Sequence, residues 1–361
     1  MKLSKRKRNR IARIVLDTRI NKDIFKFINN LRKWIFFDYK SKKDIPHPTT
    51  ISLELTNKCN LKCSMCPREH KFGEGLIHGN MSTEMARRII DENYPYLQSM
   101  GLVGLGESLF APNLVDVAKY IKSKKKSIII FISTNANFRD FIERVTPALP
   151  YLDTIQISID GTGETYEKIR VGGSYDLFLK NVKKLVELIK PYHIDLMFNM
   201  VMSKDNYTEM PAIIELSAEL GIPFVNFNYM NLACIPEIDT GYYDFFRTDE
   251  FKGVMNKARA TAQKYPNIEV TGLDDFDSNW VGKCNLVWNH FQINHDGEVP
   301  PCCGKPFPQE LSFGNVNKQP LMEVLNSPAA KKFRKSWETK KQHPFCNQCH
   351  LSFSAAQSPE K

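Results

Sequence analysis

The sequence lacks any apolar run approaching the roughly 18 residues that a membrane-spanning helix needs. Its basic N-terminus also lacks the apolar segment of a secretory signal, since the longest apolar stretch there is Trp34 to Phe37. Nine cysteines in 361 residues are too few for a disulfide-stapled scaffold, and most of them are clustered. We therefore expect a cytoplasmic protein whose clustered thiols bind metal.

Positive charge is concentrated at the N-terminus. Residues 1–43 hold 15 lysines and arginines against three aspartates, whereas the rest of the chain is close to neutral. Ile24, Ile28, Leu31 and Ile35 recur at helical spacing among these cations, which predicts a basic amphipathic helix. Such a helix can pack its apolar face on the protein or lie peripherally on an anionic membrane. No nucleic-acid-binding motif accompanies the charge, so no nucleic-acid partner is expected.

From Thr50 onward, strand-like and helix-like segments alternate. Six successive β/α units imply a parallel sheet with helical crossovers. We expect an α/β fold, a partial (β/α)6 TIM-like barrel with a small C-terminal cysteine-rich domain. The expected strands are residues 51–55, 101–104, 127–132, 153–159, 194–201 and 224–229, and the expected helices are 81–97, 113–121, 175–190 and 207–220.

The chain is expected to divide into four parts. They are a basic amphipathic arm (1–47), the barrel core (48–235), a linker (236–275) and a cysteine-rich domain (276–355). The linker is expected because residues 232–275 show no clear periodicity.

Three cysteines, Cys59, Cys63 and Cys66, follow the first expected strand. Iron–sulfur clusters usually take four protein ligands, so three thiolates without a neighbouring fourth leave one iron open to a small molecule. Their loop lies at the carboxyl end of a strand, where α/β barrels place their active sites. A zinc knuckle with the same spacing is the structural alternative.

The run Cys59-Asn-Leu-Lys-Cys63-Ser-Met-Cys66 resembles the signature of the radical S-adenosylmethionine (SAM) enzymes. In that family the open iron of a 4Fe–4S cluster binds SAM, and an electron from the cluster cleaves it to a 5′-deoxyadenosyl radical. This radical abstracts hydrogen from unreactive C–H bonds. The resemblance implies a 4Fe–4S cluster and SAM as cofactors, and a reducing partner such as flavodoxin or ferredoxin.

Later segments are similar to SAM-contacting motifs of that family. Gly104-Leu-Gly106-Glu107 resembles its GGE segment, with Leu105 inserted between the glycines, and offers a carboxylate to the SAM amino group. Ser133-Thr-Asn135-Ala136 and Ser158-Ile-Asp160-Gly161 resemble its ribose-contacting and carboxylate-contacting segments. Each segment alone is more often a turn or cap, but their order at successive strand ends favours a site. The SAM-binding residues implied are Met65, Gly104, Gly106, Glu107, Ser133, Asn135, Ser158, Asp160 and Arg170.

A second cysteine group lies near the C-terminus. Cys284, Gly297 and Cys302, followed by Cys346-Asn-Gln-Cys349, resemble the SPASM domain and its shorter relative, the twitch domain. Four thiolates suffice for one auxiliary 4Fe–4S cluster without an open iron, serving electron transfer or structural support. Cys303 can replace Cys302 as the ligand, and a zinc ribbon is the structural alternative.

Cys234, the remaining cysteine, lies just beyond the sixth expected strand. We expect it on the active-site rim, away from both clusters. Some radical SAM epimerases use a solitary cysteine to return a hydrogen atom to the substrate radical, so the resemblance implies a catalytic role for Cys234. An inert buried thiol is the alternative.

The expected activity is that of a radical SAM oxidoreductase or epimerase. Its substrate would be a small polar molecule, a sugar or aminocyclitol derivative, attacked at an unactivated C–H bond. A peptide or protein maturase is the first alternative, although residues 1–47 are too short for the winged-helix domain that such enzymes often carry. A non-catalytic zinc-binding adaptor is the second. The candidate pocket residues are Asn199, Asn226, Asn228, Tyr229 and Asn231.

Overall fold

The computed structural model describes residues 44–276, 284, 286–338 and 343–351. The predicted basic helix and its membrane contact lie outside these residues. Within the described ranges, no helix is both long enough and apolar enough to cross a membrane.

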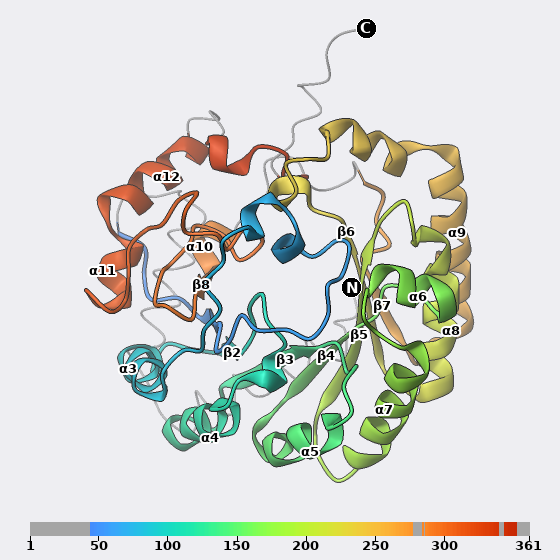
Figure 1. Cartoon of the computed structure of the whole chain (residues 1–361), viewed down its shortest axis with the longest axis horizontal. Helices are drawn as coiled ribbons and strands as arrows, with labels where there is room; N and C mark the ends of the chain where they lie inside the picture. The colour runs from blue at the N-terminus through green and yellow to red at the C-terminus, as the bar shows by residue number, and fades with distance from the viewer. Residues whose placement is uncertain (1–43, 277–283, 285, 339–342, 352–361) are drawn as a thin grey trace, which may run out of the picture.

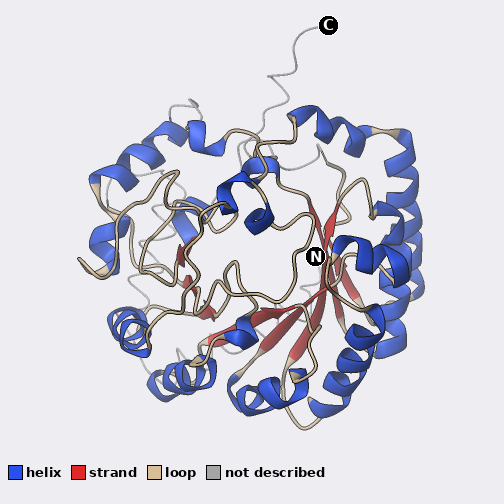
Figure 2. Cartoon of the chain, viewed as in Figure 1, coloured by secondary structure: helices blue, strands red, loops and turns tan. Residues whose placement is uncertain are grey.

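Eight parallel strands form one sheet in the described part of the chain (Figures 1 and 2). Their order is β7-β6-β5-β4-β3-β2-β1-β8, so strands β1 to β7 pair in sequence order. All the carboxyl ends consequently lie at one edge of the sheet. The strands are β1 (Thr50–Leu53), β2 (Ser99–Gly101), β3 (Ile129–Thr134), β4 (Thr154–Ser158), β5 (Asp195–Met202), β6 (Phe224–Tyr229), β7 (Glu269–Thr271) and β8 (His290–Ile293).

Helices surround the sheet, with α8 and α9 on the β7 side and α11 and α12 on the β8 side (Figure 1). Their apolar residues follow helical periodicity: α7 buries Phe178, Val182 and Leu185. The helix α3 begins where Ser82 accepts a hydrogen bond from the Met85 N–H at 3.1 Å. The helices are α3 (Thr83–Asn93), α4 (Leu114–Lys124), α5 (Phe141–Val145), α6 (Gly163–Ile169), α7 (Tyr175–Leu188), α8 (Met210–Leu220), α9 (Asp249–Lys264), α10 (Leu286–Asn289), α11 (Leu321–Leu325) and α12 (Pro328–Glu338).

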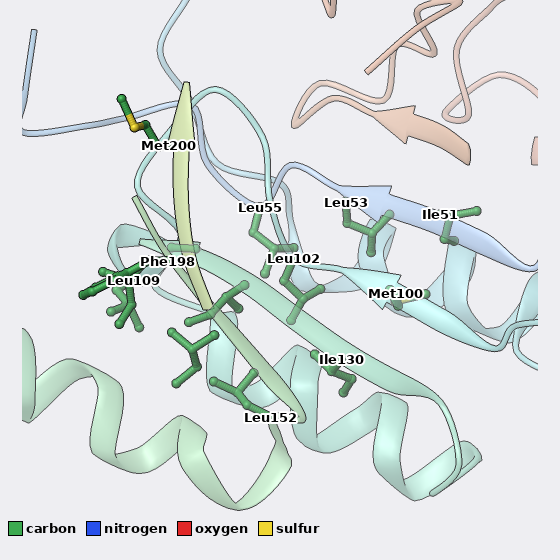
Figure 3. Close-up of a cluster of buried hydrophobic side chains, with 14 of the residues drawn as sticks. Ile51, Leu53, Leu55, Met100, Leu102, Leu109, Ile130, Leu152, Phe198 and Met200 are labelled. Carbon is green, nitrogen blue, oxygen red and sulfur yellow. The ribbon is translucent and has the colours of Figure 1, made fainter. Parts of the chain in front are cut away.

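The core lies along the sheet, where apolar side chains from neighbouring strands meet (Figure 3). Ile51 of β1, Met100 of β2, Ile130 of β3 and Phe198 of β5 are all completely buried. Apolar burial of this kind is the main favourable contribution to folding, and it holds the strand ends in fixed relative positions.

The predicted parallel α/β fold with six β/α units is confirmed, with small shifts at strand ends. The second strand is Ser99–Gly101 instead of 101–104, because Ser99 pairs with Thr50 of β1 and Ile129 of β3. Gly104 therefore lies in the loop beyond the strand. The third strand extends to Thr134, so Ser133 belongs to its carboxyl end.

The sheet has two strands that the sequence pattern did not indicate. The expected linker contains α9 and β7, and β8 of the cysteine-rich region pairs with β1. The buried face of α9 includes Ala258 and Thr261, whose small side chains weaken the helical periodicity. Both strands have only three or four residues, too few for an alternating pattern.

Shortening Ile130 to alanine should destabilise the fold by ~3 kcal/mol, because it leaves a cavity in the sheet core. Ile77→Ala is the matched control, since the Ile77 side chain is 83% exposed and its loss should change the free energy of unfolding very little. Urea unfolding followed by circular dichroism measures both. Equal destabilisation by the two substitutions would contradict the assigned core.

Candidate functional site

The predicted cofactor residues surround one cavity of about 350 Å³ at the carboxyl ends of the strands. Parallel pairing explains this convergence, because segments that follow successive strands emerge at the same edge. The lining includes Cys59, Cys63 and Cys66 together with Met65, Gly104, Gly106, Glu107, Ser133, Asn135, Ser158, Asp160 and Arg170.

The cysteine loop is held by the chain that ends α6. The Lys62 N–H donates to the Val171 carbonyl at 3.0 Å, and the Ser64 N–H donates to the Ile169 carbonyl at 2.9 Å. Burial raises the pKa of all three thiols, that of Cys66 to about 11. Because metals bind thiolates, loading this loop must release protons.

Two side-chain N–H donors lie beside the sulfur atoms. Asn135 Nδ2 is 3.7 Å from Cys59 Sγ, and Arg170 Nη1 is 3.8 Å from Cys63 Sγ. Hydrogen bonds to cysteine sulfur and a nearby cation both stabilise the charge of an anionic iron–sulfur cluster. The donor set therefore fits a three-cysteine cluster.

The glycine loop approaches the cysteine loop backbone to backbone. The Glu107 N–H donates to the Lys58 carbonyl at 2.9 Å. A Cβ atom at Gly106 would lie 2.5 Å from the Thr56 carbonyl oxygen, so only glycine permits this contact. The glycine loop thus forms one wall of the cavity, and it has no side chain at Gly106, where it lies closest to the backbone of the cysteine loop.

Glu107 is a buried carboxylate with backbone donors on both oxygens. Its Oε2 accepts from the Asn135 N–H at 2.7 Å, and its Oε1 accepts from the Leu109 N–H at 3.3 Å. Burial raises the pKa of Glu107 to about 7. An ammonium group in the cavity would stabilise the ionised form, which fits the amino group of SAM.

Arg170 and Asp160 form a buried ion pair in the cavity wall. Arg170 Nη2 lies 2.6 Å from Asp160 Oδ2, and Asp160 Oδ1 accepts from the Val201 N–H at 2.9 Å. The pair is therefore engaged within the protein and with Cys63. Contact of these residues with SAM stays a prediction.

The loop after β3 contains a strained residue. Ala136 has φ 50°, a left-handed conformation that costs an L residue energy. The bend lets Asn135 donate from Nδ2 to Asn60 Oδ1 at 2.9 Å, which joins this loop to the cysteine loop.

A second cavity of about 470 Å³ adjoins the first. The two share Met65, Pro67 and Val201 in their walls. Gly304 and His350 of the cysteine-rich region also line the second cavity. It therefore lies between the barrel and the C-terminal region, next to the cofactor site.

Four of the five predicted pocket residues line this second cavity: Asn226, Asn228, Tyr229 and Asn231. Asn199 contributes indirectly, because its Oδ1 accepts from Asn226 Nδ2 at 2.8 Å and from Asn228 Nδ2 at 2.9 Å. It orients the amides that face the cavity.

The structure corrects the expected position of Cys234. This thiol is buried, and its Sγ donates to the Gly304 carbonyl at 2.7 Å. The Gly304 N–H in turn donates to Cys302 Sγ at 3.2 Å. A short helical turn, Leu232–Cys234, directs the chain after β6 towards the C-terminal region. Cys234 thus lies beside the second cysteine group instead of on an open rim, and its hydrogen-donor role stays a prediction.

The second cysteine group lies near the end of β6, where Cys346 is buried and Cys284, Cys302, Cys303 and Cys349 are half-buried. Asn231 Nδ2 lies 3.6 Å from Cys349 Sγ, and burial raises the pKa of Cys284 to about 11. Burial also raises the pKa of Cys346. A cluster here needs four thiolates, which Cys284, Cys302, Cys346 and Cys349 can supply. Whether Cys302 or Cys303 is the ligand stays a prediction.

Two further residues of the site escaped the sequence motifs. Glu54 lies immediately beyond β1 and its Oε1 accepts from the Leu105 N–H at 2.8 Å. His295 of the C-terminal region contacts the same carboxylate. An acidic residue within the apolar segment Ile51–Leu55 was the available signal for Glu54. No local pattern marked His295.

Two family models match the chain. The Radical SAM superfamily model matches residues 53–217, and the SPASM iron–sulfur cluster-binding domain model matches residues 284–350. The chain is a radical SAM protein with a C-terminal SPASM domain. Its cofactors are accordingly a 4Fe–4S cluster, SAM and an auxiliary iron–sulfur cluster. Both matched segments lie inside the predicted domains 48–235 and 276–355, whose limits stay predictions.

Individual relatives are more distant. The chain is 25% identical to the tungsten-containing aldehyde ferredoxin oxidoreductase cofactor-modifying protein of Pyrococcus furiosus, over 83% of this chain and 86% of that protein. It is 23% identical to the antilisterial bacteriocin subtilosin biosynthesis protein AlbA of Bacillus subtilis, over 80% of this chain and 62% of AlbA. The crystal structure of Streptococcus suis SuiB bound to precursor peptide SuiA is similar in fold, with a TM-score of 0.63, 16% identity and coverage of 91% of this chain and 75% of SuiB.

The affinity for SAM should fall as pH decreases through about 7, because protonation of Glu107 removes the carboxylate that is predicted to meet the SAM amino group. Glu107→Gln should weaken binding roughly tenfold at higher pH and flatten this dependence. Equilibrium titration of the reconstituted enzyme with SAM at several pH values measures both effects. The exposed Glu69→Gln is the control. An unchanged pH profile in Glu107→Gln would contradict this role.

Iron content should separate the two cysteine groups. The wild-type enzyme should bind about eight irons, and replacing Cys59, Cys63 and Cys66 with alanine should leave about four. Replacing Cys346 and Cys349 should also leave about four, because the auxiliary cluster is lost. Cys234→Ala should retain the full amount. Loss of half the iron in Cys234→Ala would show that the auxiliary ligand set is wrong.

Proposed function

We propose that this radical SAM protein modifies a peptide or protein substrate at an unactivated C–H bond. The observation that carries the proposal is the second cavity, which adjoins the cofactor cavity and is walled by both the barrel and the SPASM region. The barrel forms one wall of this cavity and the SPASM region forms another. A cavity between two such regions can admit a substrate peptide from solvent.

The chemistry of the cavity supports a peptide ligand. Asn226, Asn228 and Asn231 line it, and each amide side chain carries both a donor and an acceptor, as a peptide group does. Asn228 is exposed to solvent and its orientation is set by Asn199. An array of amides can therefore pair with the backbone of a substrate largely independently of its side chains.

The relatives favour the same reading over the sugar or aminocyclitol substrate expected from the sequence. AlbA is named for bacteriocin biosynthesis, and SuiB has been crystallised with a precursor peptide. That expectation rested on the shortness of residues 1–47, which says nothing about a cavity formed by the barrel and the SPASM region together. The proposal keeps epimerisation or oxidation as the type of reaction at the C–H bond, and it replaces the sugar substrate with a peptide.

The residues of the two cavities have separate roles in the proposed reaction. The cluster and SAM, when bound, supply hydrogen abstraction from a C–H bond. Cys59, Cys63 and Cys66 hold the cluster, and Glu107 receives the SAM amino group. Met65 lies in the wall common to both cavities and so separates cofactor from substrate.

The C-terminal cysteines add a second redox group near the substrate cavity. Gly304 lines that cavity and also donates to Cys302 Sγ. This proximity suits transfer of an electron between the substrate and the auxiliary cluster. An external donor such as flavodoxin or ferredoxin reduces the enzyme, and cysteines that hold iron–sulfur clusters suit the reducing cytoplasm.

The proposal is tested by incubating the enzyme anaerobically with dithionite, SAM and a perdeuterated peptide. The peptide is one encoded next to the gene of this enzyme. We expect deuterium in 5′-deoxyadenosine and a matching mass change in the peptide. The triple alanine variant of Cys59, Cys63 and Cys66 is the inactive control. Nucleotide sugars are tested in parallel, and deuterium transfer from a sugar with none from the peptide would overturn the proposal.

A further inference from the structure

Glu54 is a buried carboxylate directly beneath the glycine loop. Its side chain is almost fully buried, and its Oε1 accepts from the Leu105 N–H at 2.8 Å. A Cβ atom at Gly104 would lie 2.4 Å from Glu54 Cγ. The loop therefore rests on the Glu54 side chain, and the spacing between them has no room for adjustment.

The other oxygen of Glu54 faces the SPASM region. Its Oε2 lies 3.3 Å from the His295 backbone nitrogen, which donates to it, and 3.2 Å from His295 Nδ1. The imidazole also fills the space beside Gly79, where a Cβ atom would lie 2.6 Å from His295 Cδ2. The Glu54 N–H donates to the Ile293 carbonyl at 2.9 Å, so the backbones are joined as well.

One carboxylate thus joins two segments that are distant in the sequence. A buried carboxylate is costly unless its oxygens are hydrogen-bonded. Loss of the His295 donors to Glu54 therefore disturbs its contact with Leu105, and loss of the Leu105 donor disturbs its contact with His295. Leu105 precedes Glu107 by two residues, and a shift of the loop moves the carboxylate that meets the SAM amino group.

We propose that Glu54 and His295 are positioning residues that couple SAM binding to the docking of the SPASM region on the barrel. The pair acts through the glycine loop, and neither residue lines the cofactor cavity. The inference rests on the assignment of residues 104–107 to SAM, which the Glu107→Gln variant tests separately.

The test compares SAM binding in reconstituted full-length variants with confirmed iron content. His295→Ala and Glu54→Gln should each raise the dissociation constant for SAM roughly tenfold, because a hydrogen bond to a charged group is lost. His295→Asn should restore most of the affinity, since an amide nitrogen can replace Nδ1. Asp296→Asn is the matched control, because it removes an exposed neighbouring charge without touching Glu54.

Spectroscopy and additivity distinguish positioning from general loss of structure. SAM changes the electron paramagnetic resonance spectrum of the reduced cluster. In His295→Ala and in Glu54→Gln this change should need correspondingly more SAM, and the signal of the auxiliary cluster should be intact. The double variant should bind SAM no more weakly than Glu54→Gln alone, because the residues act as one unit.

The outcomes separate this inference from the site assignment. Wild-type affinity in both His295→Ala and Glu54→Gln, with weakened binding in Glu107→Gln, would overturn the coupling and leave the SAM site in place. Wild-type affinity in Glu107→Gln would instead overturn the assignment of the glycine loop. Fully additive losses in the double variant would also contradict the coupling.

Discussion

Parallel pairing of β1 to β5 is the constraint on which the site depends. It brings the carboxyl ends of five strands, and the segments that follow the first four, to one edge of the sheet, although they are spread over more than a hundred residues of sequence. The buried side chains of β1, β2, β3 and β5 keep that edge rigid (Figure 3). Short, irregular loops can then supply the cluster ligands and the glycine segment, and the ends of β3 and β4 supply further polar residues, because the sheet sets their positions.

Burial disfavours the charged forms of the ionisable groups in the cofactor cavity. Burial raises the pKa of the three thiols and of Glu107, which favours the protonated forms where the chemistry needs charged ones. The Arg170 guanidinium offsets part of this cost beside Cys63, whereas the Asp160 carboxylate acts in the opposite direction. Binding of a cluster by the thiolates and of an ammonium group by Glu107 is therefore linked to proton release.

The SPASM region is more than an appended module. Its first strand, β8, extends the barrel sheet, and its residues line the second cavity. Cys234 of the barrel in turn hydrogen-bonds to Gly304 of the SPASM region. These contacts place the auxiliary cysteines close to the second cavity, where, under the proposed function, a second redox group can exchange an electron with the substrate.

The sequence by itself determined the features that depend on local order. The cysteine spacing, the motifs after β2, β3 and β4, and the six β/α units are all encoded within short windows. Tertiary structure alone decided that Cys234 faces Cys302 through Gly304, that β7 and β8 extend the sheet, and that Glu54 meets His295. Each of these is a contact between segments far apart in the sequence, and the local pattern of one segment does not specify its partner. Their contacts arise from packing across the sheet, which no window of neighbouring residues records.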